Sequence, residues 1–375
     1  MIIHEMEFSF MDNNLKSAIE AFNYEGEYVT CGEIKAGIIN ATYKVTYKNG
    51  GVEKHYILQK INTNVFRNPE GLMDNVSRVT AHIRAKLDEN DPDYERRVLR
   101  ILTANGKYTF YDADGNCWRS YVYVDNATAY NAISDPALFY EAGKGFGAFQ
   151  KDLFDFPAEM LSETIPNFHN TKSRFDAFEE AIKNDAAGRV KDVMPEIEFV
   201  RARRDLASSI VDRLASGELP IRVTHNDTKL NNILIDDQTK KAICVIDLDT
   251  IMPGSSLYDF GDAIRFGANT AAEDEPDTSK IDVNMDLFKL FTKGFVEECA
   301  QSFDKSEIRL LPLGALVMTY ELVIRFLTDY INGDTYFKTL YPEHNIVRTR
   351  AQMKLLESLE AKLDQMNAFV ESMLA

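Results

Sequence analysis

The sequence predicts an α+β chain whose first third forms a mainly antiparallel sheet and whose remainder is mainly helical. Two observations predict this fold class. Short runs rich in β-branched and aromatic residues, separated by turn signals, fill the part before residue 125. Helical periodicity dominates from about residue 138 onward. We therefore expect two units, residues 1–125 and 126–375, which a chain of 375 residues can readily form.

The composition is that of an ordinary folded chain, with 45% hydrophobic and 27% charged residues. Forty-two basic against fifty-nine acidic side chains give a net charge of −17. Such a charge repels phosphate backbones at long range, so we expect no nucleic-acid partner. Binding of a single nucleotide is still compatible with this charge, because the charges of a local site can offset the repulsion from the net negative charge of the protein.

Neither a membrane span nor an export signal is expected. The first residues lack a basic leader, and the longest apolar stretch, 316–327, is interrupted by Glu321 and Arg325. Four widely spaced cysteines form no metal or redox motif and fit a reducing compartment. We expect a cytoplasmic protein whose partners are small molecules, with no membrane contact.

The N-terminal unit is predicted to begin with strands at 28–34, 41–47 and 55–61. A turn is expected at 35–37, and the Asn-Gly-Gly run at 49–51 is a strong hairpin signal. Apolar residues at helical spacing predict one helix over 73–87. Further strands are expected at 98–102, 108–111 and 118–124.

The C-terminal unit is predicted to be helical with one embedded hairpin. Helices are expected at 138–156, 174–184, 196–215, 285–303, 307–332 and 349–374. Between them, strands at 232–235 and 241–246 flank a turn at Asp236 and Asp237.

One motif decides the interpretation. Residues 225–232 have the pattern H-x-D-x-K-x-x-N, with apolar, strand-like residues on both sides. Fifteen residues beyond Asn232, Asp247 ends the second strand of the hairpin. This arrangement is typical of the catalytic loop and metal aspartate of kinase-fold phosphotransferases. Together with the two units, it predicts a bilobal protein-kinase-like fold with a β-rich N-terminal lobe and a mainly helical C-terminal lobe.

The chemistry of phosphoryl transfer explains these residue types, because it needs positioning and charge neutralisation. Asp227 would orient the acceptor hydroxyl, and Lys229 would offset charge on the transferred group. Asn232 and Asp247 would bind magnesium, which prefers oxygen ligands. The motif thus predicts Mg²⁺ as a cofactor. The alternative is a polar hairpin whose Asp and Asn residues only make turns.

The run Asp259-Phe260-Gly261 matches the metal motif of protein kinases, but it lies too far from Asp227 and follows a Pro-Gly turn. We expect Asp259 to start a helix or brace a loop, and Asp247 remains the predicted metal ligand. Asp249, two residues further on, is predicted to touch the metal or the acceptor.

These motifs resemble the aminoglycoside phosphotransferase and choline kinase superfamily, and within it most closely the N-acetylhexosamine 1-kinases. The resembling blocks lie at 56–62, 225–232, 245–254, 259–267 and 325–330 with 333–337. The resemblance implies transfer of the γ-phosphate of ATP to the anomeric C1 hydroxyl of N-acetylglucosamine or N-acetylgalactosamine.

The chain departs from the wider kinase pattern at the nucleotide phosphates. Kinases commonly anchor them with a lysine on the third strand. Strand alternation here puts Gln59 in that register, so either Gln59 replaces the lysine or Lys60 reaches round. No glycine-rich GxGxxG loop is present, and the turn at 37–42 would serve instead, with Asn40 and Thr42 as candidate ligands.

The strand end at Tyr123 and Val124 is predicted to pair with adenine through its backbone, unless it is a plain edge strand. For the acceptor we predict contacts from Asp227, Asp249, His169, Arg325 and Tyr336. Each of the last three has a simpler alternative. His169 could cap or brace a loop, Arg325 could pair with Asp329 at helical spacing, and Tyr336 could pack in the core.

Two other functions stay open at this point. One is a kinase of another small acceptor, such as an aminoglycoside or an amino alcohol, which would need carboxylates at the acceptor site. The other is a nucleotide-binding pseudokinase, which the missing strand lysine allows and the intact Asp227, Asn232 and Asp247 disfavour.

Overall fold

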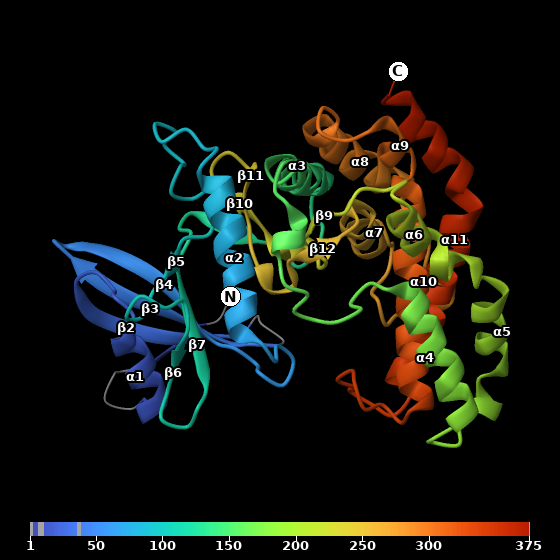
Figure 1. Ribbon diagram of the computed structural model, residues 1–375, viewed down its shortest axis with the longest axis horizontal. Helices are drawn as coiled ribbons and strands as arrows, with labels where there is room; N and C mark the ends of the chain where they lie inside the picture. The colour runs from blue at the N-terminus through green and yellow to red at the C-terminus, as the bar shows by residue number, and fades with distance from the viewer. Residues whose placement is uncertain (1–2, 7–10, 36–38, 375) are drawn as a thin grey trace.

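The computed structural model describes residues 3–6, 11–35 and 39–374 and has the predicted α+β architecture. A twisted sheet, drawn in blue to teal, occupies one side of the molecule, and the helices, drawn in green to red, occupy the other (Figure 1). The predicted kinase-like fold is therefore confirmed in its two-part layout.

The sheet of the N-terminal part is antiparallel, and in the described residues it has seven strands in the order β1-β2-β3-β4-β7-β5, with β6 beside β7. Its strands are β1 (Ile3–Met6), β2 (Glu27–Ile34), β3 (Ala41–Asn49), β4 (Val52–Lys60), β5 (Ile101–Leu102), β6 (Phe110–Tyr111) and β7 (Cys117–Val122). The predicted hairpin turn is present, since Gly50 and Gly51 take φ angles of 57° and 87°, which glycine adopts without steric cost.

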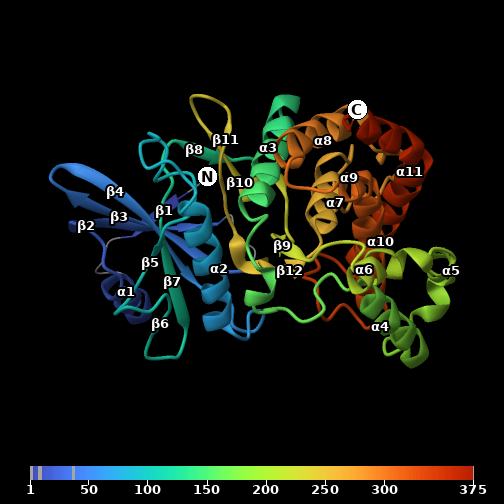
Figure 2. The same cartoon turned by 45° about the horizontal axis from the view of Figure 1, so that its top comes forward.

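Two helices cover this sheet, α1 (Asn13–Ala21) and α2 (Pro69–Arg84). Helix α1 was not predicted; it is short, and Asp12 caps it by accepting a hydrogen bond from the N–H of Leu15 at 2.8 Å. Helix α2 begins before the predicted residue 73, because Asn68 caps it and Pro69 occupies its first turn. Figure 2 shows α2 between the sheet and the helical part.

The C-terminal part packs around one long helix. Its helices are α3 (Pro136–Asp152), α4 (Thr171–Asn184), α5 (Met194–Ala202), α6 (Asp205–Ser216), α7 (Ser256–Gly267), α8 (Met285–Cys299), α9 (Lys305–Arg309), α10 (Leu311–Ile331) and α11 (His344–Ser372). Helix α10 contacts α4, α6, α7 and α11. By length and composition alone α10 could cross a membrane, but 83% of its apolar window is buried inside the protein, where it forms the core.

Two predictions for this part need correction. The expected helix 196–215 is divided into α5 and α6, and the expected helix 307–332 is divided into α9 and α10, because Pro312 starts a new helix. Helix α7 was predicted only as a possible helix start at Asp259. That start is confirmed: Ser255 caps α7 and Asp259 lies in its first turn.

Small strands carry the predicted catalytic segment. The predicted hairpin is present as β10 (Ile233–Asp236) and β11 (Ala242–Val245), and β8 (Ala127–Ala129) adds to it in the order β11-β10-β8. Strands β9 (Arg222–Thr224) and β12 (Met252–Gly254) pair beside it. Because β8 joins the C-terminal part, we propose that the division into 1–125 and 126–375 falls just before it.

Candidate active site

The catalytic-loop residues come together as the motif predicts. The loop runs from β9 to β10, and Asp227 and Lys229 are half-buried in it. The Lys229 ammonium lies 2.6 Å from Asp227 Oδ1. The Asn232 amide donates to the Asp227 carbonyl at 2.7 Å and to Asp227 Oδ2 at 3.0 Å. Asp227 thus has one oxygen on the lysine and the other on the asparagine, which fixes its orientation.

Buried polar groups hold this loop from behind. The fully buried Asp259 accepts hydrogen bonds from the backbone N–H of His225 at 2.9 Å and of Asn226 at 2.7 Å. It also accepts one from the Gln150 amide at 2.7 Å. Burial raises the pKa of Asp259, against the opposing effect of His225. The prediction that Asp259 braces a loop is confirmed, and its oxygens are already occupied by protein donors.

His225 joins the loop to the strand that ends at Asp247. Its Nε2 donates to the Ile246 carbonyl at 2.9 Å, and its Nδ1 accepts from the N–H of Asp227 at 3.3 Å. With no exposed surface and both ring nitrogens engaged, His225 is a structural residue of the loop.

Asp247 follows β11 in a left-handed conformation, with φ of 59°. Its side chain is exposed, yet protein atoms crowd around it; this desolvation, with the charges of Asp249 and Asp227, raises the pKa of Asp247 to about 6. The N–H of Ile246 donates to the Asn232 carbonyl at 2.9 Å, so the segments carrying Asn232 and Asp247 are joined directly.

The residues present fit a magnesium ion. The Asn232 amide nitrogen is engaged by Asp227, which leaves its oxygen as the ligand atom, and Asp247 offers an exposed carboxylate. Among the described residues no group of three or more His, Cys, Asp or Glu side chains could hold a metal. Magnesium needs no such cage, because it takes one or two carboxylates and fills its other positions with water and phosphate.

On the sheet, the predicted phosphate ligands form a row. Thr42, Gln59 and Arg119 are cross-strand neighbours on β3, β4 and β7. The Gln59 amide donates to Thr42 Oγ1 at 3.0 Å, and Arg119 Nε donates to Gln59 Oε1 at 3.0 Å. Gln59 therefore occupies the register that the alternation predicts, and Lys60, one residue further along β4, faces the opposite side.

Asn40 and Asp249 join the sheet to the segment that carries Asp247, the predicted metal ligand. Asn40 Nδ2 donates to Asp249 Oδ2 at 2.7 Å, while Asn40 Oδ1 accepts from the N–H of Asn62 at 2.9 Å. Asp249, 4% exposed, also forms an ion pair with Arg119. The first residues of the predicted turn, Gly37 and Ile38, lie outside the described residues.

Arg119 is the main residue that the sequence interpretation missed. It is 1% exposed and lies in the buried strand β7. The signal was an arginine within an otherwise buried strand, directly opposite Gln59, since a buried guanidinium requires partners.

Tyr123 and Val124 follow β7 where the predicted hinge should be. The N–H of Tyr123 donates to the His55 carbonyl at 3.0 Å, and the Lys44 ammonium lies 4.6 Å from the centre of the Tyr123 ring. Val124 is buried. Their contact with adenine stays a prediction.

On the acceptor side, His169 has a bracing position. It is 8% exposed, its Nδ1 lies 2.8 Å from Glu321 Oε1, and its Nε2 lies 3.2 Å from the Asn226 carbonyl. Thr171 donates to the second Glu321 oxygen at 2.7 Å. These contacts favour the bracing alternative for His169, which connects the catalytic loop to α10.

For Arg325 and Tyr336 the structure does not support the simpler alternatives, which were pairing with Asp329 and packing in the core. Arg325 does not pair with Asp329, which instead accepts backbone N–H groups of residues 335–337. Its nearest charge is Glu321 Oε1, at 3.7 Å. Its guanidinium lies over the rings of Phe168, Tyr336 and Phe337, at 5.6, 6.0 and 5.5 Å. Tyr336 is 66% exposed, so the core-packing alternative for it is wrong.

A second arginine, not predicted, stands close to the first. Arg174 donates to the Phe168 carbonyl at 3.1 Å, and its buried Nε has no hydrogen-bond partner among the described residues. Burial and the charge of Arg325 lower the pKa of Arg174. Positive charge on this side therefore exceeds what Glu321 can balance.

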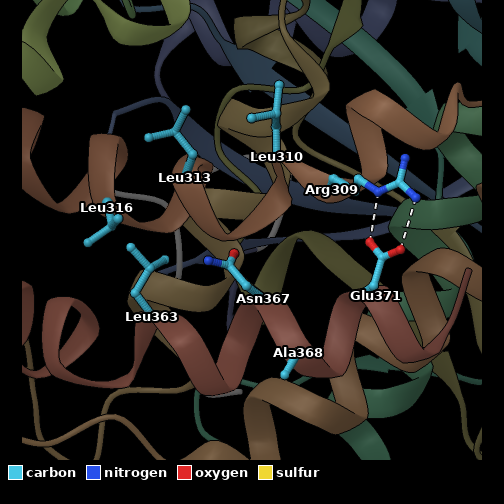
Figure 3. Close-up of a pocket in the computed structure, with 8 residues that line it drawn as sticks. All are labelled: Arg309, Leu310, Leu313, Leu316, Leu363, Asn367, Ala368 and Glu371. Carbon is cyan, nitrogen blue, oxygen red and sulfur yellow. Dashed lines mark hydrogen bonds and ion pairs between the residues drawn. The ribbon is translucent and has the colours of Figure 1, made fainter.

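A separate apolar groove lies between α10 and α11 (Figure 3). It is lined mainly by leucines, among them Leu310, Leu313 and Leu363, and the Arg309–Glu371 ion pair of 2.7 Å closes one end. None of its lining residues belongs to the candidate active site.

The two-part fold and the catalytic loop together define the class: a kinase-fold phosphotransferase. The family model described as the phosphotransferase enzyme family, APH, matches residues 30–281, and the chain belongs to this family. It is thus a small-molecule phosphotransferase of the aminoglycoside phosphotransferase and choline kinase type.

Solved structures agree with this fold. An aminoglycoside phosphotransferase from Alicyclobacillus acidocaldarius is 13% identical with a TM-score of 0.62, covering 95% of this chain and 96% of that one. A microcompartment-associated aminopropanol kinase is 15% identical with a TM-score of 0.59, covering 94% and 97%. The GDP complex of aminoglycoside 2′-phosphotransferase-IIIa is 14% identical with a TM-score of 0.57, covering 94% and 100%. At such identities the likeness establishes the fold alone.

Proposed function

We propose that the protein is an ATP- and Mg²⁺-dependent kinase that phosphorylates the anomeric C1 hydroxyl of an N-acetylhexosamine, either N-acetylglucosamine or N-acetylgalactosamine. The observation that supports this acceptor class most is the arginine pair. Arg174 and Arg325 share Phe168 as a neighbour, the buried Nε of Arg174 has no hydrogen-bond partner in the described part of the chain, and Arg325 has its nearest charge, Glu321, 3.7 Å away. Sugar hydroxyls and an acetamido carbonyl are neutral acceptors that can satisfy such donors.

A cationic acceptor fits this side poorly. Amino alcohols and aminoglycosides carry ammonium groups, which two neighbouring guanidinium groups would repel. The nearest carboxylate, Glu321, is fully buried and already engaged by His169 and Thr171. An amino alcohol or aminoglycoside kinase is therefore the second candidate, supported only by the likeness of fold.

The mechanism is direct in-line transfer to the sugar hydroxyl. Asp227, fixed by Lys229 and Asn232, orients the C1 hydroxyl and accepts its proton. Lys229 lies where it can offset charge on the transferred phosphoryl group. Asn232 and Asp247 would hold magnesium, which would neutralise the phosphates when bound. The assembled triplet of Asp227, Asn232 and Asp247 disfavours a pseudokinase.

On the nucleotide side, the backbone at Tyr123 and Val124 would pair with adenine. Asn40, Thr42 and Gln59 would contact the phosphates through amide and hydroxyl groups. A nucleotide as phosphate donor is also what the GDP-bound relative supports by analogy. Four unpaired, buried cysteines are consistent with a cytoplasmic location.

The test is ADP release with ATP and Mg²⁺ over a panel of acceptors: N-acetylglucosamine, N-acetylgalactosamine, glucose, galactose, choline and kanamycin. We expect turnover confined to the two N-acetylated sugars, with a product phosphate that is stable in alkali and released in acid, as a C1 phosphate is. Turnover on choline or kanamycin, with none on the sugars, would overturn the acceptor assignment and leave the kinase class standing.

A further inference from the structure

The inference concerns the buried ion pair between Arg119 and Asp249, which joins the two parts of the molecule. Arg119 belongs to β7 of the N-terminal sheet, and Asp249 belongs to the short helical turn Leu248–Thr250 of the C-terminal part. Both are almost without exposed surface, at 1% and 4%. Burying two charges is costly unless geometry and hydrogen bonds compensate, so a buried ion pair is by itself weak evidence for a role in stability.

Asp249 is contacted by two side chains of the N-terminal part, one on each of its carboxylate oxygens. Arg119 approaches it from β7, and Asn40 donates to its second oxygen at 2.7 Å from the segment that precedes β3. Asp249 lies two residues after Asp247 in the same turn. Fixing Asp249 in place therefore also fixes the backbone that presents Asp247, the proposed magnesium ligand.

Arg119 also determines how Gln59 is oriented. Because Arg119 Nε donates to the Gln59 oxygen, the Gln59 nitrogen must point away, and it donates to Thr42. The contacts thus form one chain, Asp249–Arg119–Gln59–Thr42, with Asn40 as a second connection from Asp249 to the sheet. Each of these four side chains thus contacts at least one other member of the set through a hydrogen bond or an ion pair.

Arg119 also compensates negative charge in this region. Asp227, Asp247 and Asp249 are three carboxylates in one region, and Lys229 is paired with Asp227. Arg119 is the buried cation paired with Asp249; burial lowers the pKa of Arg119, and the charges of Asp249 and Asp247 raise it. Without it, Asp249 would be a buried, unpaired charge next to the proposed metal ligand.

We propose that Arg119 is a positioning residue that compensates for the missing strand lysine. Through Asp249 it orients the segment that carries Asp247, the proposed magnesium ligand. Through Gln59 it orients the row of side chains on the sheet that would face the phosphates. This gives Asp249 a role in positioning in place of the substrate contact that its sequence position predicted. The inference rests on the proposed function only in taking a magnesium nucleotide as the ligand.

The experiment measures binding of a fluorescent ATP analogue to the full chain while Mg²⁺ is titrated, with no sugar present. We expect Arg119→Met to raise the Mg²⁺ concentration at half-saturation by about tenfold or more, as loss of an outer-shell partner typically does. Arg119→Lys should not restore the wild-type value, because one ammonium cannot serve Asp249 and Gln59 in the same fork geometry.

The double variant gives the sharpest result. If the pair acts as a unit, Arg119→Met with Asp249→Asn binds the magnesium nucleotide better than Arg119→Met alone, because the unpaired charge is removed. Purely additive losses in the double variant would overturn the proposal.

A matched control is Arg222→Met, since Arg222 forms a similarly buried pair with Glu307 at 2.7 Å. We expect this variant to lower the melting temperature without moving the Mg²⁺ half-saturation. An Arg119→Met variant that behaves like Arg222→Met would overturn the proposal and leave the kinase function intact. A wild type without Mg²⁺-dependent nucleotide binding would overturn both, whereas nucleotide binding without sugar turnover would overturn only the acceptor assignment.

Discussion

The proposed nucleotide side and the proposed acceptor side of the site are built in opposite ways. On the nucleotide side the polar groups of Asp249, Arg119 and Gln59 are engaged with one another before any ligand is present. On the proposed acceptor side the buried Nε of Arg174 has no hydrogen-bond partner among the described residues, Arg325 has its nearest charge 3.7 Å away, and Tyr336 is exposed. The difference indicates that the proposed phosphate-transfer residues are preorganised. The proposed acceptor-binding residues, in contrast, would complete their contacts only when the acceptor binds.

The largest expected effect tests the preorganised side. Asp227→Asn should lower kcat by about 10³-fold or more, because it removes the proton acceptor while keeping the size of the side chain. Nucleotide binding should stay within about twofold of wild type, since Asp227 is proposed to contact the acceptor rather than ATP. Steady-state rates and nucleotide binding measure both. Near-normal turnover in this variant would assign the proton acceptor elsewhere.

Asp247→Ala should have the next largest effect, through the metal. We expect the Mg²⁺ concentration at half-saturation of nucleotide binding to rise about tenfold to hundredfold. Asp259→Asn is the comparison variant, because Asp259 braces the loop by accepting backbone N–H groups. It should lower the melting temperature, with a smaller change in the Mg²⁺ titration. An unchanged Mg²⁺ titration for Asp247→Ala would transfer the ligand role to another carboxylate.

Arg325→Met tests the acceptor side. We expect KM for the sugar to rise about tenfold to hundredfold, the amount that a hydrogen bond from a charged donor contributes, while KM for ATP is unchanged. Arg350→Met is the matched control, since Arg350 lies on the exposed surface and pairs with Glu196 at 2.7 Å. Equal changes in both KM values for Arg325→Met would contradict the division into two sides.

Tyr336→Ala should have the smallest effect. Because the side chain is 66% exposed, we expect the melting temperature to stay within about 1 °C of wild type, as surface substitutions usually do. The KM for the sugar should rise about threefold to tenfold if the ring covers the bound acceptor. A lower melting temperature with an unchanged sugar KM would make Tyr336 a structural residue.

The parts of the site that lie close in sequence were predictable. Asp227 and Asn232 belong to one loop, and the hairpin that delivers Asp247 follows at once, so turn signals and spacing were sufficient. Arg119 and Arg174 were missed, because their meaning depends on partners 130 residues away at Asp249 and 151 residues away at Arg325. The α+β layout followed from periodicity. The division within 307–332 follows from Pro312, a local signal that periodicity alone does not register.

The linker between the two parts has a mechanical consequence. Arg96 holds it from the N-terminal side, donating to the carbonyls of Asp125 and Asn126 at 3.2 and 3.0 Å and to Asp236 of β10 at 2.7 Å. A rotation of the sheet relative to the helical part would therefore pivot at this linker, beside the backbone contact between Tyr123 and His55 of β4. Asn40 precedes the end of the β3–β4 ladder at which Ala41 pairs with Lys60, so it would move with the sheet. Such a rotation would separate Asn40 from Asp249, and the two parts are thus held together both at the linker and across the site.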